Sequence, residues 1–391
     1  MKTIFSKCWT FLLVFAAMCT SARAQQGPIV RLDGSTISPT EIDRAVVQSM
    51  DQAHVTGVGI AVFNQHRIAY LKTYGFRDTE KRLPLTPDSI MTAASLSKSA
   101  FATMVMGLVH DKIIDLDKPV CEYLPGTLPE YRRYHDLAGD PRYKQITMRM
   151  LLDHTSGFPN WRWAMPDKKL GIYFQPGTRF GYSGEGIDLA QLTVEIVTNR
   201  SITELMDERL FRRLGMTRTS MVWEPRFESD FANGYDEQGK SLGPERRQRG
   251  DAAGGMQTTL RDYARLVQAV LDRRIPDARS RQAMLSPQIQ ILSAHEFPSL
   301  DTGMNAAGDR AIRLSYGLGW GLFWTPYGKA FFKEGHDDGW RHYVVCFDSP
   351  KTGMLIMTNS SNGEDIYDGL LRTVIRDSFT PLDWEGFRPA H

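Results

Sequence analysis

The chain has 391 residues, of which 42% are hydrophobic and 24% charged, as is ordinary for a globular protein with a substantial core. Its formal net charge of +2 at pH 7 gives no reason to expect a nucleic acid or an anionic membrane as partner. The length allows one large domain or two ordinary ones. We find no repeat of fixed period and no low-complexity tract, which excludes a repeat architecture.

Residues 1–24 have the pattern of a secretory signal peptide. Lys2 and Lys7 precede an apolar run at residues 9–18, and a small-x-small cleavage site follows at residues 22–24. Ten or so apolar residues are too few to cross a bilayer, which takes about 20. We therefore expect an exported protein, periplasmic or secreted, with no transmembrane anchor in the mature chain.

Cleavage after residue 24 leaves two cysteines, Cys121 and Cys346. A pair so far apart in a chain of this length does not make a disulfide framework. We favour two buried thiols, with a single structural disulfide as the alternative. Neither cysteine has a nearby histidine in the sequence and no C-x-x-C occurs, which argues against a cysteine nucleophile or a zinc–thiolate site.

Helical and strand patterns alternate along the chain in a simple order. A helix is predicted over residues 41–52 with Thr40 as its N-cap, followed by strands at residues 58–63 and 68–71. Mainly helical signals follow, at residues 97–109, 148–152, 186–197, 202–212 and 260–271. Strand signals return at residues 316–324, 330–333, 342–347 and 354–358, before a final helix at residues 365–377. This order predicts an α+β fold whose antiparallel sheet is built from both ends of the chain.

Ser95 and Lys98 form the only Ser-x-x-Lys of the chain, at the start of the helix predicted over residues 97–109. Residues three apart share a face of a helix, so the lysine amine can reach the serine oxygen. Backbone N–H groups in the first turn have no partner within the helix and can face an oxyanion. These features together suit acyl transfer.

Tyr182 lies in a turn-rich segment just before the helix predicted from residue 186. A lysine ammonium beside it would favour the phenolate, which could then take the serine proton and return it to a leaving group. Residues 181–185 nearly spell the G-x-S-x-G elbow of α/β-hydrolases, but the fifth residue is Glu185 and no βαβ pattern surrounds them. An α/β-hydrolase is therefore disfavoured.

Three Lys-x-Gly triplets, beginning at Lys169, Lys333 and Lys351, are candidates for a further substrate-binding lysine. Lys351 belongs to a literal K-T-G, but Pro350 and Gly353 mark its surroundings as a hairpin turn. A catalytic lysine belongs on a strand beside the nucleophile. We therefore choose Lys333, which ends the strand predicted at residues 330–333.

These three motifs, in this order and spacing, resemble those of the serine β-lactamase and penicillin-binding-protein superfamily, and especially its class C β-lactamase-like group. The resemblance extends to Leu152–Gly157, to the Gly254–Asp262 segment and to the Met357–Asn359 strand. It implies one catalytic domain of β-lactamase/transpeptidase-like fold. In it, residues 25–92 and 310–391 form the α/β sheet region, and residues 93–309 form a mostly helical region.

The resemblance also implies a mechanism without metal or cofactor. Ser95 would attack an ester, amide or lactam carbonyl while Lys98 and Tyr182 relay its proton, either of them acting as base. The backbone N–H groups of Ser95 and His336 would bind the oxyanion, and water would release the acyl group. On the substrate side the site would contain Lys333, Gly335, His336 and Gly184.

Two departures from the resemblance bear on the substrate. Class C β-lactamases have Tyr-x-Asn as second motif, and Gly184 here offers no side-chain amide. Glu334 replaces the threonine of the third motif and places a carboxylate where that of a β-lactam would approach, so like charges repel. We expect an esterase or D-Ala-peptidase-like activity on a small ester, amide or peptide. Alternatives are a true β-lactamase and a non-catalytic cell-wall-binding relative.

Trp161 and Trp163 are candidates for an apolar acyl pocket, because they follow a Gly-Phe-Pro turn. They could equally be ordinary core or surface aromatics. The spacings of His154, His336 and His342 do not suggest a shared face, so no metal site is expected from them.

Overall fold

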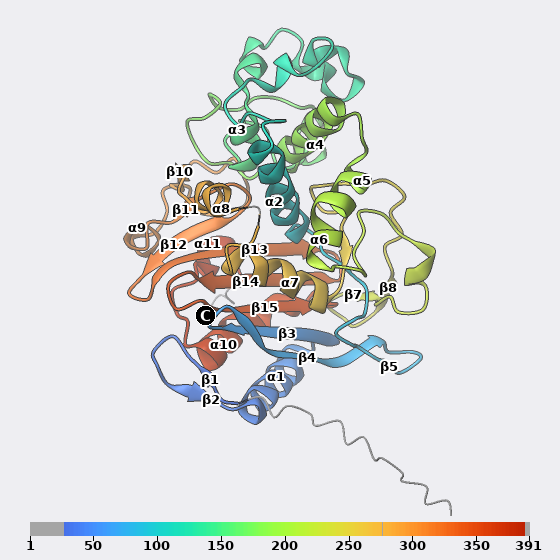
Figure 1. Ribbon diagram of the computed structural model, residues 1–391, viewed down its shortest axis with the longest axis vertical. Helices are drawn as coiled ribbons and strands as arrows, with labels where there is room; N and C mark the ends of the chain where they lie inside the picture. Colours follow the sequence, from blue (N-terminus) through green and yellow to red (C-terminus); the bar gives the residue numbers. More distant parts are fainter. Residues whose placement is uncertain (1–26, 276, 388–391) are drawn as a thin grey trace, which may run out of the picture.

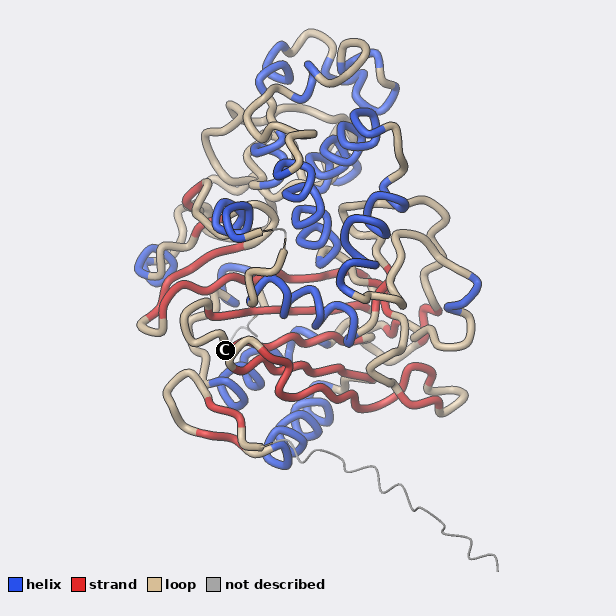
Figure 2. The backbone as a smooth tube through the Cα atoms, in the orientation of Figure 1, coloured by secondary structure: helices blue, strands red, loops and turns tan. Residues whose placement is uncertain are grey.

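The computed structural model describes residues 27–275 and 277–387, so the expected signal peptide lies outside the described residues. A nine-stranded antiparallel sheet runs through the molecule (Figures 1 and 2). In spatial order its strands are β10 (Ile289–Gln290), β11 (Ser315–Tyr316), β12 (Gly321–Thr325), β13 (Gly328–Asp337), β14 (Trp340–Phe347), β15 (Thr352–Thr358), β3 (Gly57–Asn64), β4 (Arg67–Asp78) and β5 (Leu83–Pro84).

Three short two-stranded ladders accompany this sheet. They are β1 (Ile29–Val30) with β2 (Thr36–Ile37), β6 (Met91–Thr92) with β9 (Gln257–Thr258), and β7 (Gly234–Tyr235) with β8 (Ser241–Gly243). The α-helices are α1 (Pro39–Ala53), α2 (Leu96–His110), α3 (Met148–Leu152), α4 (Gly184–Thr198), α5 (Ile202–Met206), α6 (Arg212–Leu214), α7 (Leu260–Leu271), α8 (Ala278–Met284), α9 (Ala307–Ala311), α10 (Tyr367–Leu370) and α11 (Leu382–Glu385).

The two ends of the chain meet between β3 and β15, which pair antiparallel with Ile60 opposite Ile356. The predicted α+β fold, with a sheet from both chain ends, is confirmed. Alternate residues of β3 pack on opposite faces, as strand geometry requires. Ile60 joins a core with α1 and α10, whereas Ala61 joins a second core with α2 and α7, so the sheet is buried on both sides.

Helix α2 lies between the sheet and the helical part of the molecule (Figure 1), in contact with β13, α5 and α8. Nearly all of its residues are buried, including the polar Ser97, Lys98 and Ser99. A helix that is apolar all round belongs inside a protein. The buried apolar residues of α2 all belong to the core that includes Ala61, so packed side chains enclose the start of this helix.

The structure differs from the sequence expectations at several boundaries. The N-cap of α1 is Ser38, not Thr40, because a capping box with Glu41 and a proline at the first helical position set the start earlier. The strand predicted at residues 316–324 is split into β11 and β12 by a turn in which Gly319 has φ +77°. The predicted helix at 365–377 consists of a 3₁₀ turn, α10 and a π-helical turn that ends at Ile375.

Cys121 and Cys346, the cysteines within the described residues, are both free thiols. Cys346 is buried as expected, but Cys121 is only half-buried. Within the described ranges, no helix is long and apolar enough to cross a membrane.

Candidate active site

Ser95 and Lys98 meet at the start of α2. Lys98 Nζ lies 2.9 Å from Ser95 Oγ and donates a second hydrogen bond of 2.6 Å to the carbonyl of Ala253. The lysine is 1% exposed. Ser95 occupies the N-cap position, yet its hydroxyl makes no capping bond to the helix. Its oxygen is therefore free for chemistry and held by the lysine.

The backbone before Ser95 is held in an unusual conformation. Ala94 has φ +48°, a region that costs an alanine roughly 1–2 kcal/mol. Two contacts with the segment before β9 hold it there: Ala93 N–H donates to Met256 O at 2.8 Å, and Met256 N–H donates to Ser97 Oγ at 3.1 Å. Ser97 Oγ in turn donates to Ala94 O at 2.7 Å. Strain imposed in this way is typical of functional sites.

Lys98 is suited to be a base. Burial, and then the neighbouring Lys333 ammonium, lower the pKa of Lys98 from 10.5 to about 8. Roughly a tenth of the amine is therefore neutral at pH 7, and this neutral form can accept a proton from Ser95.

Tyr182 lies between the two lysines. Its hydroxyl is 3.0 Å from Lys333 Nζ, and the Nζ atoms of Lys98 and Lys333 lie 5.0 and 4.8 Å from its ring centre. Burial first, and then the Glu334 carboxylate, hold the pKa of Tyr182 well above its usual range. The expectation of a favoured phenolate is therefore wrong, because desolvation outweighs the ammonium groups.

A buried histidine fixes the position of Tyr182. The ring of His154 lies 4.4 Å from that of Tyr182, and its Nδ1 accepts a hydrogen bond of 3.2 Å from Ser183 N–H. Burial and then Lys98 lower the pKa of His154 well below 6.5, so the ring is neutral. Ser183 caps α4 through a 2.9 Å bond from Gly186 N–H.

Gly184 makes room for an aromatic side chain. A Cβ atom at Gly184 would lie 2.4 Å from Trp161 Cη2, far inside van der Waals contact. The Gly184 N–H donates to Asn160 Oδ1 at 3.0 Å. Trp161 stacks on the 66% exposed Trp163, with ring centres 6.5 Å apart. The tryptophan pair thus occupies the space that an asparagine side chain would need.

Strand β13 carries Lys333 and Gly335 to the start of α2. Lys333 is fully buried and pairs with the Glu334 carboxylate. A Cβ at Gly335 would lie 2.9 Å from Ala93 O, so only glycine allows the strand so near to the segment that presents Ser95. Lys351 lies in the turn between β14 and β15, away from the cavity that contains Ser95.

One cavity of about 920 Å³ contains Ser95, and the predicted site residues Gly184, Lys333 and Gly335 are not among the described residues that line it. Ser95, Lys98, Tyr182, Glu334 and His336 line it, and so do both tryptophans. Some lining or supporting residues were not singled out in the sequence, because they come from distant segments and carry no motif: Asn160, Arg247, Asp251, Ala253, Glu296, Phe297 and Glu385. Burial next to other carboxylates, visible only in three dimensions, is what distinguishes Glu296 and Glu385.

Comparison with known proteins identifies a family and several relatives of this chain. The family profile described as Beta-lactamase matches residues 42–375. A β-lactamase of Lysobacter lactamgenus is 23% identical over 401 residues, covering 96% of this chain and 98% of that protein. Protein Flp of Staphylococcus aureus (strain N315) is 24% identical over 222 residues, 52% of this chain. That match covers 42% of Flp, so this chain spans less than half the length of that relative.

Solved structures share the fold. D-alanine carboxypeptidase AmpC from Burkholderia cenocepacia gives a TM-score of 0.68 at 20% identity, covering 86% of this chain and 97% of that one. A class C β-lactamase gives 0.68 at 18% identity, covering 86% and 94%. With these agreements across most of its length, the chain belongs to the β-lactamase family.

Proposed function

We propose that this member of the β-lactamase superfamily of serine hydrolases uses Ser95 to form an acyl-enzyme with an ester or amide substrate. The 2.9 Å contact between Ser95 Oγ and the buried amine of Lys98 carries the proposal. A serine is a weak nucleophile until a neighbouring base takes its proton. Lys98, with its pKa near 8, is that base, and Tyr182 remains protonated.

The acylation step follows from these protonation states. Ser95 Oγ forms a bond to the carbonyl carbon as its proton passes to the neutral Lys98 Nζ. The backbone N–H groups of Ser95 and His336 stabilise the oxyanion. Tyr182 donates its proton to the leaving group and is reprotonated by the Lys98 ammonium. Water then hydrolyses the acyl-enzyme, with the same groups acting in reverse.

The substrate we propose carries no carboxylate beside the scissile bond. Glu334 lines the cavity, and its carboxylate would repel an anionic group of the substrate. In another part of the wall, beside Gly184, Trp161 fills the place of an amide that would bind an acylamide side chain. An apolar or aromatic acyl group suits this wall. These features favour an esterase or peptidase over an efficient β-lactamase.

Two alternatives have weaker support. A true β-lactamase is suggested by the names of the Lysobacter relative and of the class C neighbour. A non-catalytic cell-wall-binding relative would not need Ser95 and Lys98 in contact. We also propose export to the periplasm or beyond, supported by the signal-like residues 1–24.

The test is covalent labelling together with a substrate panel. Purified protein is treated with a fluorophosphonate probe, and turnover is measured on p-nitrophenyl esters, D-Ala-D-Ala peptides and nitrocefin. We expect labelling and ester turnover in the native protein and neither in Ser95→Ala. Ser241→Ala, whose hydroxyl does not line the cavity, serves as control and should behave as the native protein.

Each result has a distinct meaning. Equal labelling of Ser95→Ala would refute the nucleophile assignment. Nitrocefin turnover above that of every ester and peptide would establish the β-lactamase alternative. A folded native protein that neither labels nor turns over any substrate would favour the non-catalytic relative.

A further inference from the structure

A second cavity, of about 1130 Å³, lies beside the one that contains Ser95, and we call it the distal cavity. It is lined by residues 131–134, by side chains of α4 and by residues 247–251. Neither Ser95 nor Lys98 is among the described residues that line it, so the acylation mechanism gives it no role. The two cavities share four lining residues: Trp161, Trp163, Arg247 and Asp251.

The boundary between the two cavities consists of partly exposed side chains. Trp163 is 66% exposed although one face of its ring stacks on Trp161. Arg247 and Asp251 pair at 2.8 Å, and the side chain of each is 29% exposed. A substrate chain that leaves Ser95 along the tryptophans therefore reaches the distal cavity across these side chains and not across the core.

The acidic side chains of the distal cavity are already bound. Four carboxylates line it, and each has a partner among the described residues. The contacts are those of Glu185 with Arg133 and Arg162, of Asp188 with Arg133, of Asp251 with Arg247, and of Glu195 with the Ile202 N–H and the Gln191 amide. The cavity therefore offers no unpartnered carboxylate to a cationic ligand.

Two arginines of the same cavity are not bound in this way. Arg132 and Arg249 are exposed, and within the described chain their guanidinium groups form no ion pair or hydrogen bond. They come from segments more than a hundred residues apart, yet they line one cavity. A guanidinium presents a planar fork of donors that matches a carboxylate.

Tyr134 adds an observation that does not depend on charge. It lines the distal cavity and is 1% exposed, and its hydroxyl has no hydrogen-bond partner among the described residues. Buried hydroxyls in proteins nearly always have a partner, either a protein group or a water molecule. The missing partner points to a polar group, from water or from a ligand, at this wall.

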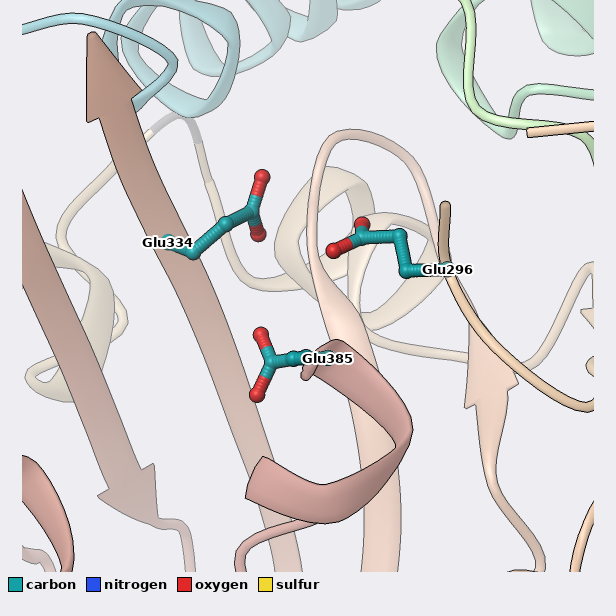
Figure 3. Close-up of side chains that lie close together, drawn as sticks. All are labelled: Glu296, Glu334 and Glu385. Carbon is teal, nitrogen blue, oxygen red and sulfur yellow. The ribbon is translucent and has the colours of Figure 1, made fainter. Parts of the chain in front are cut away.

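The wall of the active-site cavity next to β13 offers a different environment. Glu334 and Glu385 line that cavity and lie close to Glu296 (Figure 3). Lys333 already pairs with the Glu334 carboxylate. A substrate carboxylate thus meets a lysine that is already paired at this wall, but two unpaired arginines in the distal cavity.

We propose that the distal cavity binds the far end of the substrate's acyl chain, and that this end carries a carboxylate bound by Arg132 and Arg249. The substrate is then a long ester or amide whose acyl part is apolar where it passes Trp161 and Trp163 and anionic at its end. The inference rests on the proposed function, because it takes the acyl group on Ser95 to lie along the tryptophan wall.

The experiment compares pairs of esters that differ only in the charge at the end of the acyl chain. They are p-nitrophenyl half-esters of hexanedioic, octanedioic and decanedioic acid, with the second carboxyl either free or capped as a methyl ester. In native protein at low salt, kcat/KM for the free acid should exceed that for its capped partner by about threefold to tenfold at one chain length or more. Molar NaCl should remove this preference, because it screens exposed charges.

Substitution of the two arginines should remove the same preference. Arg132→Gln and Arg249→Gln should each lower the ratio of the two kcat/KM values by about twofold to fivefold, and the double variant should bring it to about one. Use of the ratio cancels any effect common to both esters. Arg279→Gln is the matched control and should keep the native ratio, because Arg279 is also exposed and without a side-chain partner in the described structure, but lines neither cavity.

Two outcomes would overturn the inference while leaving the proposed function intact. One is ester turnover with no preference for the free acid at any chain length. The other is a preference that survives in the double variant, which would place the carboxylate elsewhere.

A native protein that turns over no ester would contradict the proposed function instead. The distal cavity is then tested by itself, through calorimetric binding of the corresponding p-nitroanilides to Ser95→Ala protein. Tighter binding of the free acid than of its capped partner, lost when both arginines are also replaced by glutamine, would support the site. Equal affinities of the two compounds would overturn it.

Discussion

The amine of Lys98 has almost no contact with solvent and must be neutral to accept the Ser95 proton. Its pKa is lowered to about 8, first by burial and then by Lys333. Tyr182 stays protonated throughout this range, because its pKa is raised well above 10. One ionisation should therefore control acylation. We predict that the acylation rate of an ester rises tenfold per pH unit below about 8 and levels above it, as measured by stopped-flow with a chromogenic ester.

Lys98→Met is the control for this prediction, and it should show no acylation at any pH. Between pH 8 and 10.5 the folded native chain releases the Lys98 proton while the unfolded chain keeps it, so native stability rises with pH over this window. Below pH 8 the Lys98 amine is charged in the folded chain, so the folded state bears the full free-energy cost of burying that charge. Lys98→Met should thus be more stable than native at pH 7 by about 1–3 kcal/mol, and this advantage should shrink above pH 8. A flat native pH profile would contradict the base assignment.

At the scale of elements, Lys333 and Lys351 can be compared directly. Each begins a Lys-x-Gly triplet, but one lies in a strand and the other in a turn. Lys333 is buried within β13 and contacts Tyr182, whereas Lys351 sits in the β14–β15 turn with φ +51°. We predict that Lys333→Ala lowers kcat/KM for esters by about 10²-fold or more, since it removes a charge aimed at the site. Lys351→Ala should stay near the native value. Steady-state kinetics on the two variants, with thermal midpoints measured to verify that both are folded, test which lysine serves the active site. A larger loss of kcat/KM in Lys351→Ala than in Lys333→Ala would assign that role to Lys351 instead.

Parts of the site could be predicted from the sequence where the pattern that marks them spans only a few neighbouring residues. Ser95 and Lys98 are one helical turn apart in the sequence. The strand-like apolar residues before Lys333 distinguish it from Lys351, which lies between Pro350 and Gly353 in a turn. The protonation of Tyr182 was predicted wrongly, because it depends on burial and on Glu334, which only the tertiary structure brings near. Ala253 acts through its carbonyl, which every residue has, so no sequence signal could identify it.

The fold, like the site, could be predicted only where neighbouring residues determine the structure. The apolar run at residues 58–63, ended by a polar turn, and the return of strand signals near the C-terminus were enough to predict a sheet from both chain ends. The 3₁₀ and π-helical turns around α10 follow from packing on the sheet rather than from periodicity, and the sequence predicted one plain helix there. Glu296 and Glu385 gather at Glu334 from separate segments, which no spacing rule anticipates.

At the scale of the whole molecule, the sheet and the helical region are joined at Gly319. Its N–H donates to Leu152 O at 2.9 Å in α3, and its carbonyl accepts from Ser99 Oγ at 2.6 Å in α2. A Cβ there would lie 2.4 Å from the Cβ of Ala102. One hydrophobic core includes side chains of α2, of β3 and β15, and of the helical region, so the two parts should unfold together.

A matched pair of glycines tests this junction. Gly319 and Gly239 have φ of +77° and +76°, but a Cβ at Gly239 meets no atom within 4 Å. Gly239→Ala should therefore cost only backbone strain, about 1–2 kcal/mol, whereas Gly319→Ala adds overpacking for a total of about 2–5 kcal/mol. Urea unfolding followed by circular dichroism measures both, and labelling at Ser95 should be lost over the same urea range in each protein. Equal losses of stability in the two variants would show that α2 shifts to make room for the added Cβ at residue 319. Loss of labelling at a urea concentration well below that of the circular dichroism transition would show that the catalytic junction opens independently of the sheet.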